Sequence, residues 1–148
     1  MEKIRLVGAV PLAGNRLLIC FDTDEMRLYR FEDLKGLMPE LALLENSGLF
    51  ERMELESNGR ELSWPGCCRI SAHRLSKFGE RLSLNQKDLV RFCQTQLLST
   101  SETAQLLRCT RQNIDSLVRR NRLIPIKCYT KNKLFLRSDV LRRMWELD

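Results

Sequence analysis

The hydrophobic residues of this chain recur with two different periods, and the change between them falls near residue 83. Before it, short runs alternate apolar with polar residues between turn signals, which is typical of β-hairpins. After it, apolar residues recur every three or four positions behind Ser and Thr caps, which is typical of short helices. A chain of 148 residues has room for two small domains. We therefore predict the α+β class, with one domain at residues 1–82 and a second at 83–148.

The first half predicts a meander of three strands. These strands are expected at residues 4–10, 16–21 and 26–31. Pro11 ends the first strand, and Gly14-Asn15 marks the turn into the second. Short helical turns are expected over residues 32–46.

A second hairpin is predicted around Asn58-Gly59, with strands over residues 50–56 and 61–64. No catalytic constellation accompanies these elements. His73, the one histidine, has no Cys or Ser nucleophile at a recognisable spacing. We therefore predict that the chain is not an enzyme.

The six cysteines predict neither a metal site nor a disulfide framework. No two of them have Cys-x-x-Cys spacing, and nothing in the sequence indicates secretion. We expect small buried hydrophobes, no metal and no cofactor. Whether the adjacent pair Cys67-Cys68 senses metal or redox state stays open. No apolar run reaches the roughly 18 residues that span a bilayer, and the first residues do not form a signal peptide, so no membrane and a cytoplasmic location are expected.

The net charge of +6 is divided unevenly between the two halves. Residues 1–82 carry 12 basic and 13 acidic side chains, whereas residues 83–148 carry 13 basic and 6 acidic ones. Within residues 108–137 there are nine Lys or Arg residues and one acid, Asp115. A basic half indicates an anionic partner, and double-stranded DNA is the first candidate because phosphate neutralisation gives strong affinity.

Two short helices with a tight turn between them are predicted in the basic half. Ser99 to Glu102 is a capping box, and Thr110 caps a helix over residues 111–120, with Asn121 in the left-handed position that ends it. Two short helices with a turn of about three residues between them are typical of a helix-turn-helix. An earlier helix over 84–97, capped by Ser83, is expected to link the halves through one apolar stripe. That stripe consists of Leu89, Val90, Cys93 and Leu97.

One face of the second helix is predicted to contact DNA. Ile114, Leu117 and Val118 are expected to pack against the first helix, which leaves the polar face free. Gln and Asn suit base edges, whereas Arg and Lys suit phosphates or guanine. The residues predicted to contact DNA are Thr110, Arg111, Gln112, Asn113, Ser116, Arg119, Arg120, Lys131 and Lys133.

A two-stranded wing is predicted after this helix, followed by a last helix. Its strands cover residues 123–129 and 134–136, and the turn between them supplies Lys131 and Lys133. Ser138-Asp139 then caps a helix with Val140, Leu141, Met144 and Trp145 on its apolar face.

The C-terminal half resembles the excisionase-like branch of the winged helix-turn-helix proteins, relatives of the MerR-type regulators. The motif residues that carry the resemblance are Leu98 to Leu107, Thr110 to Ile114, Leu117 to Leu123 and Phe135 to Val140. Two positions depart from the family pattern. Asp115 and Ser116 stand where the family often has Tyr and a basic residue, and Asn121 replaces the usual Gly. The resemblance implies DNA binding, whereas the acid at 115 repels phosphate and leaves the base preference open.

The N-terminal half resembles a bacterial domain family of about 80 residues and unknown function. The matching segments are Leu12 to Asp22, Met26 to Tyr29, Gly48 to Met53 and Leu62 to Pro65. The first hairpin turn departs from it, because Thr23-Asp24-Glu25 stands where the family usually has Gly. The family is often encoded beside a small toxin-like protein or fused to a helix-turn-helix. The resemblance implies a binding or assembly module.

Three functions follow from these observations. The first is a sequence-specific transcriptional regulator that acts as a homodimer. One form of this function is an antitoxin-like autoregulator with a small toxin-like protein as its partner. The second is an excisionase-like protein that bends DNA for recombination. The third is a protein-interaction module without DNA binding. We take the first as the working hypothesis, with the N-terminal domain as its pairing module.

Overall fold

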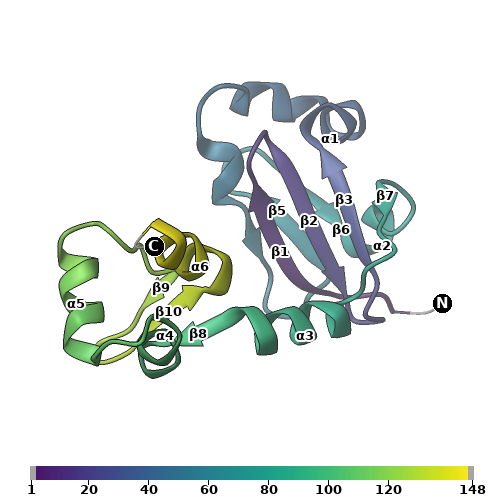
Figure 1. Ribbon diagram of the computed structural model, residues 1–148. Helices are drawn as coiled ribbons and strands as arrows, with labels where there is room; N and C mark the ends of the chain where they lie inside the picture. Colours follow the sequence, from purple (N-terminus) through teal and green to yellow (C-terminus); the bar gives the residue numbers. More distant parts are fainter. Residues whose placement is uncertain (1–2, 147–148) are drawn as a thin grey trace. The chain divides into compact units, whose positions relative to one another are not determined.

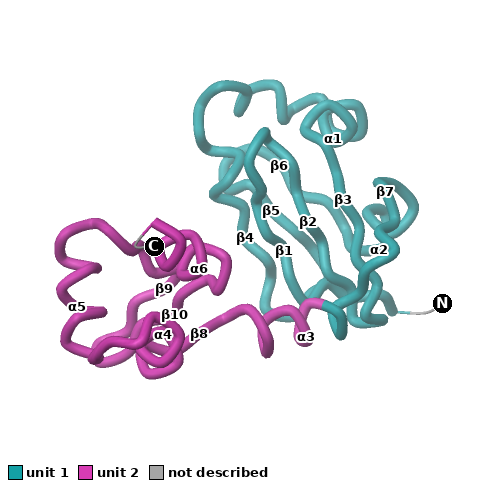
Figure 2. The backbone as a smooth tube through the Cα atoms, viewed as in Figure 1, with its two compact units in different colours: residues 1–88 teal, residues 89–148 magenta. Residues whose placement is uncertain are grey.

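The computed structural model describes residues 3–146 and has an α+β fold, as predicted. The chain divides into two compact units, residues 1–88 and residues 89–148 (Figure 2). The sequence prediction placed this border at 82/83. Each unit has its own hydrophobic core.

The first sheet contains four antiparallel strands in the order β1-β2-β3-β7 (Figure 1). Its strands are β1 (Leu6–Leu12), β2 (Arg16–Phe21), β3 (Met26–Arg30) and β7 (Glu80–Arg81). Gly14 and Asn15 both have positive φ, 77° and 53°, and turn β1 into β2 as predicted. The prediction that Pro11 ends the first strand is wrong. Pro11 lies within β1 opposite Leu17, and an edge strand tolerates a residue without an N–H.

Three helical segments follow β3: α1 (Phe31–Leu37), η1 (Pro39–Leu44) and η2 (Leu49–Arg52). The last of them corrects the predicted strand over 50–56, of which only β4 (Glu54–Leu55) is extended. The cause is tertiary. Phe50 is buried between Phe31 and Trp64, and the Trp64 indole N–H donates to the Phe50 carbonyl at 3.0 Å. The segment Leu49–Arg52 therefore forms a helical turn, although its acids alternate with apolar residues as in a strand.

The second sheet has the order β4-β5-β6 and is also antiparallel. Strand β5 (Glu61–Trp64) and the turn at Gly59, with φ of 72°, match the prediction. Strand β6 (Cys68–Ser71) and helix α2 (Ala72–Leu75) were not predicted. One core joins both sheets to α1, with Leu17, Leu34 and Leu62 all fully buried.

Helix α3 (Gln86–Gln96) carries the chain from one unit into the next, and it has no buried residue. Its cap is Asn85, not the predicted Ser83, because the Asn85 and Asp88 side chains each accept from the other's backbone N–H, at 3.1 and 3.0 Å. The predicted apolar stripe is not buried, since Val90 is 54% exposed and Cys93 is exposed too.

After α3, the second unit combines a three-stranded sheet with the helices α4, α5 and α6 (Figure 1). In chain order its elements are β8 (Leu97–Ser99), α4 (Thr100–Leu107), α5 (Arg111–Arg119), β9 (Lys127–Cys128), β10 (Lys133–Leu136) and α6 (Arg137–Glu146). The sheet has the order β8-β10-β9, so β8 is a third strand that was not predicted. The predicted strand over 123–129 shortens to β9, since Leu123 instead enters the core.

The core of the second unit is small. Its buried members come from β8, α4, α5, β10, α6 and the segment after α5: Leu98, Ala104, Ile114, Leu117, Leu123, Phe135 and Val140. Ile114, Phe135 and Val140 have no exposed surface at all. Trp145, expected among the apolar contacts of the last helix, is 61% exposed, so that expectation is wrong.

Candidate nucleic-acid interface

Helices α4 and α5 are begun by side-chain caps at the predicted residues. The Ser99 hydroxyl accepts from the Glu102 N–H at 3.1 Å, and the Ser99 N–H donates to the Glu102 carboxylate at 3.0 Å. Thr110 caps α5 by accepting from the Asn113 N–H at 3.1 Å. Because a cap fixes where a helix starts, these contacts set which residues of α5 face the core.

Left-handed backbone follows each of the two helices. Arg108 ends α4 with φ of 55°, and Asn121 follows α5 with φ of 56°. Asparagine adopts this conformation more readily than most residues, so Asn121 ends α5 without a glycine. Arg120 is the C-cap of α5 rather than its last helical residue.

Helix α5 has one buried face and one exposed face. Ile114 and Leu117 are buried against the core of the unit, and Val118 packs beside it. Of the residues predicted to contact DNA, those on the helix and its cap are exposed apart from Ser116, which is half-buried: Thr110, Arg111, Gln112, Asn113, Arg119 and Arg120. The two amides occupy the first turn, where a recognition helix contacts base edges.

The predicted wing lies beside α5, because an ion pair joins the two. The Lys133 ammonium at the start of β10 lies 3.4 Å from the Asp115 carboxylate of α5. The turn itself is closed by the Tyr129 N–H, which donates to the Asn132 carbonyl at 2.6 Å, and its tip carries the exposed Lys131. Sequence reasoning treated Asp115 as a charge that repels phosphate. The structure gives that charge a cationic neighbour instead.

A cavity of about 440 Å³ opens where α4, α5 and the wing meet. Its walls come from the start of α4, from Arg111 of α5 and from the wing, and consist of Ser99, Thr100, Ser101, Arg111, Tyr129, Asn132, Lys133 and Leu134. Two cations thus share one cavity with the first turn of a helix, whose free N–H groups favour anions. The cavity brings Arg111 and Lys133 together but does not include Arg119 or Arg120.

Tyr129 and the hydroxyls of residues 99–101 are the functional candidates that sequence reasoning missed. Tyr129 is 51% exposed, and the Lys127 ammonium lies 5.4 Å from the centre of its ring. A run of three hydroxyl residues at a helix start was a signal for an anion site, since each hydroxyl can donate and the N–H groups of Thr100 and Ser101 lie outside the capping box of Ser99 and Glu102.

The cysteines contribute no site in the part of the chain that the structure describes, where no group of three His, Cys, Asp or Glu side chains could hold a metal ion. Burial and a hydrogen bond with Cys67 raise the pKa of the Cys68 thiol to about 12. Cys67 donates to the Glu40 carbonyl at 3.3 Å. A thiol held protonated in this way is a poor metal ligand and a slow nucleophile.

Comparison with protein-family models, with curated proteins and with solved structures finds no match to this chain. None of the helices over residues 3–146 is long and apolar enough to cross a bilayer. The two resemblances drawn from the sequence stay predictions, and the case for a nucleic-acid interface rests on the geometry of α4, α5 and the wing.

Proposed function

We propose that the second unit binds double-stranded DNA as a winged helix-turn-helix and that the chain is a sequence-specific transcriptional regulator. The observation that carries the proposal is the exposed face of α5. It presents Gln112, Asn113 and Arg119 to solvent while Ile114 and Leu117 fix the opposite face in the core. A helix with polar amides in its first turn and arginines in its last fits a major groove between two phosphate backbones.

The proposed binding mode divides the contacts into two kinds. Gln112 and Asn113 read base edges, because their amides match the donor and acceptor pair of adenine. Arg111, Lys131 and Lys133 hold phosphate, with one phosphate seated in the cavity beside the first turn of α4. Arg119 and Arg120 contact the backbone at the far end of α5. Phosphate contacts supply affinity, and the two amides supply specificity.

Two half-sites extend the recognition that one unit can provide. A single module of this size covers few base pairs, so operator binding requires a homodimer. We assign pairing to the first unit, and an antitoxin-like role with a small toxin-like partner is the form of regulation that the proposal favours. An excisionase-like role uses the same contacts, and it differs in that the bound DNA is bent.

The test is footprinting of the purified full-length protein on DNA from its own genome, followed by titration of the bound site at several salt concentrations. The affinity is expected to fall steeply with salt, with a smaller slope for K131A/K133A. Gel mobility of circularly permuted sites separates bent from unbent DNA. A full-length protein that shows no salt-dependent affinity for any genomic fragment would exclude the proposal.

A protein-interaction module is the second candidate, favoured by one observation. Ile124, Ile126 and Tyr129 are 71%, 53% and 51% exposed on the segment that leads through β9. Exposed apolar side chains on one short segment are typical of a surface that binds another protein. In that case the same titration gives no DNA binding, and I124S/I126S abolishes capture of a protein partner without changing the fold.

A further inference from the structure

The first sheet has two faces, and the face that points away from the core is called the outer face here. Side chains alternate between the two sides of a strand, and Leu17, Ile19 and Tyr29 are fully buried in the core. Their neighbours in β1, β2 and β3 therefore form the outer face, in three rows across the strands: Gly8-Cys20-Met26, Val10-Leu18-Leu28 and Leu12-Arg16-Arg30. In Figure 1, β1 and β2 lie in front of β5 and β6, so the outer face is turned toward the viewer.

The middle row of the outer face is apolar and partly open to solvent. Val10 is 43% exposed, and Leu18 and Leu28 are half-buried. An antiparallel sheet that faces water usually carries polar side chains at these positions. An apolar surface at positions where polar side chains are usual is typical of a site that binds another protein.

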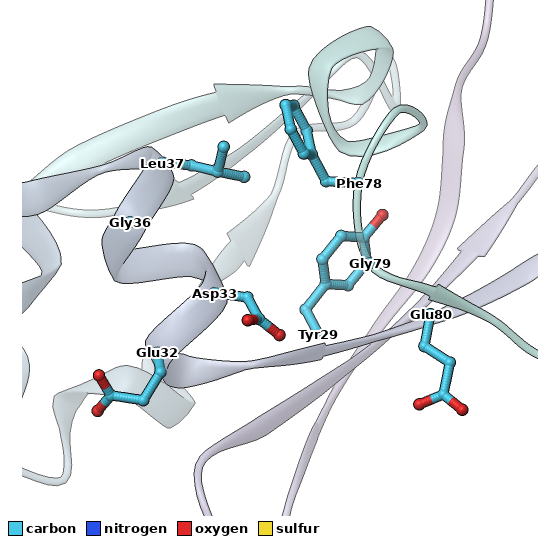
Figure 3. A pocket seen from close by; sticks show the side chains of 8 residues that line it. All are labelled: Tyr29, Glu32, Asp33, Gly36, Leu37, Phe78, Gly79 and Glu80. Atoms are coloured by element: carbon cyan, nitrogen blue, oxygen red, sulfur yellow. The ribbon is translucent and has the colours of Figure 1, made fainter.

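Charges of both signs border the apolar row. Arg16 and Arg30 lie side by side in the next row, and Glu80 of β7 extends the apolar row, because it pairs with Leu28. Figure 3 shows the Glu80 carboxylate pointing away from the Tyr29 ring, as expected for a side chain on the outer face. Within residues 3–146, neither Arg30 nor Glu80 forms an ion pair. Both charges can therefore pair with another molecule.

The distribution of these charges is complementary to itself. Neighbouring strands of a sheet lie about 4.8 Å apart, and successive residues on one face of a strand lie about 7 Å apart. With these spacings, a two-fold axis that crosses the apolar row diagonally places Glu80 of one copy opposite Arg30 of the other. The same axis leaves the two leucines of the row at the centre of the contact. The strands of the two copies then cross at a large angle, which is one of the two ways in which sheets pack.

We propose that the outer face of the first sheet binds the outer face of a second copy of the chain. Val10, Leu18 and Leu28 form the centre of this interface, and two ion pairs each join Glu80 of one copy to Arg30 of the other. The inference rests on the proposed function in one respect, because a homodimer that reads two half-sites needs a pairing surface in the first unit. The contacts involve no DNA, so pairing is measurable without it.

The test measures the dissociation constant of the full-length dimer by sedimentation equilibrium without DNA. E80R and R30E each bring like charges together across the interface, so each is expected to raise this constant by about tenfold or more. The two variants change the net charge of the chain in opposite directions, so general repulsion between copies does not explain a loss in both. E80R/R30E exchanges the two charges and is expected to restore the affinity of the unchanged dimer.

A third variant tests the apolar row. V10K places a charge at the centre of the interface without reaching the core, and we expect it to be monomeric. The matched controls are E51R and L43K, which make the same kinds of change at exposed residues of the first unit outside the outer face. Both controls are expected to pair like the unchanged chain. Thermal melts followed by circular dichroism verify that each variant is folded.

Three results would overturn the proposal: a monomeric full-length chain, a dimer that E80R, R30E and V10K leave unchanged, or an E80R/R30E variant that pairs as weakly as the single variants. Titration with DNA separates this failure from a failure of the proposed function. A monomeric chain with salt-dependent DNA affinity would contradict the pairing surface alone. A dimer that E80R weakens, but that binds no DNA, would contradict the proposed function alone.

Discussion

Gln112 is the residue on which the proposed specificity depends. Its amide is exposed in the first turn of α5 and has no role in the core. Q112A is expected to cost about 1–3 kcal/mol at the bound site and little on random DNA, because only base readout is lost. Fluorescence anisotropy with the two duplexes measures this difference. Q94A changes an exposed glutamine of α3 and serves as the control. An equal loss on both duplexes would show that Gln112 contacts phosphate.

Asp115 is expected to limit DNA affinity. Its carboxylate holds the Lys133 ammonium at 3.4 Å and adds a negative charge to the exposed face of α5. D115N frees Lys133 for phosphate, so we expect tighter binding and a salt dependence steeper by about one unit. D139N is the matched control, because it also breaks an ion pair of the second unit, that with Arg142. Weaker binding by D115N would mean that the ion pair positions the wing for DNA.

The thiols should differ in reactivity according to their exposure. Cys93 and Cys128 are exposed, and the others are half-buried: Cys20, Cys67, Cys68 and Cys109. Burial raises the pKa of Cys20, Cys68 and Cys109, which lowers the thiolate fraction at neutral pH. We expect Cys93 and Cys128 to react fastest with an aromatic disulfide reagent at pH 7.5. Mass spectrometry identifies which cysteines have reacted. Fast labelling of Cys67 or Cys68 would reopen a redox or metal role for that pair.

At the scale of elements, the segment before β7 depends on one glycine. G79A is expected to lower the free energy of unfolding of the first unit by about 2–4 kcal/mol. Part of this cost is the left-handed backbone, and the rest is the clash with the Tyr29 ring at 2.6 Å. G48A measures the backbone contribution alone, since Gly48 has φ of 74° and open space around it. This variant should lower the free energy of unfolding by about 1 kcal/mol. Urea unfolding measures both variants. Equal losses of stability in G79A and G48A would show that the Tyr29 ring moves aside without an energetic cost.

Elements whose signals are local could be predicted from the sequence. The caps Ser99 and Thr110, the left-handed Asn121 and the turn at Gly59 each depend on one or two residues, and all four are confirmed. The exposed face of α5 followed from its caps and its 3.6-residue period. The residues assigned to that face remain a prediction with respect to DNA.

Elements that depend on distant partners could not be predicted. Strand β8 continues directly from α3 without a turn signal, and it is extended because it pairs with β10. Strand β7 has two residues and exists through its pairing with β3. The segment at Phe50 alternates like a strand yet is helical, because Trp64 and Phe31 enclose its ring. The cavity beside α4 escaped prediction for the same reason, since the wing that completes it comes about thirty residues later.

At the scale of the whole molecule, the two units should be separable. The second unit has its own core, centred on Ile114, Phe135 and Val140, and α3 adds no buried residue to it. A fragment of residues 83–148 is therefore expected to fold. Its stability should be marginal, because domains of this size bury only about 60% of their unfolded surface. Circular dichroism and calorimetry of the fragment beside the full chain check this expectation.

The same fragment tests where pairing resides. It keeps the +7 charge of residues 83–148, so we expect it to bind DNA with a steep salt dependence and without tight operator affinity. The loss follows because a monomer engages one half-site, whereas a dimer engages two. Light scattering gives the mass of the fragment and of the full chain, and titration of the footprinted site gives their affinities. A dimeric fragment that binds as tightly as the full chain would place pairing in the second unit. The first unit would then serve another partner.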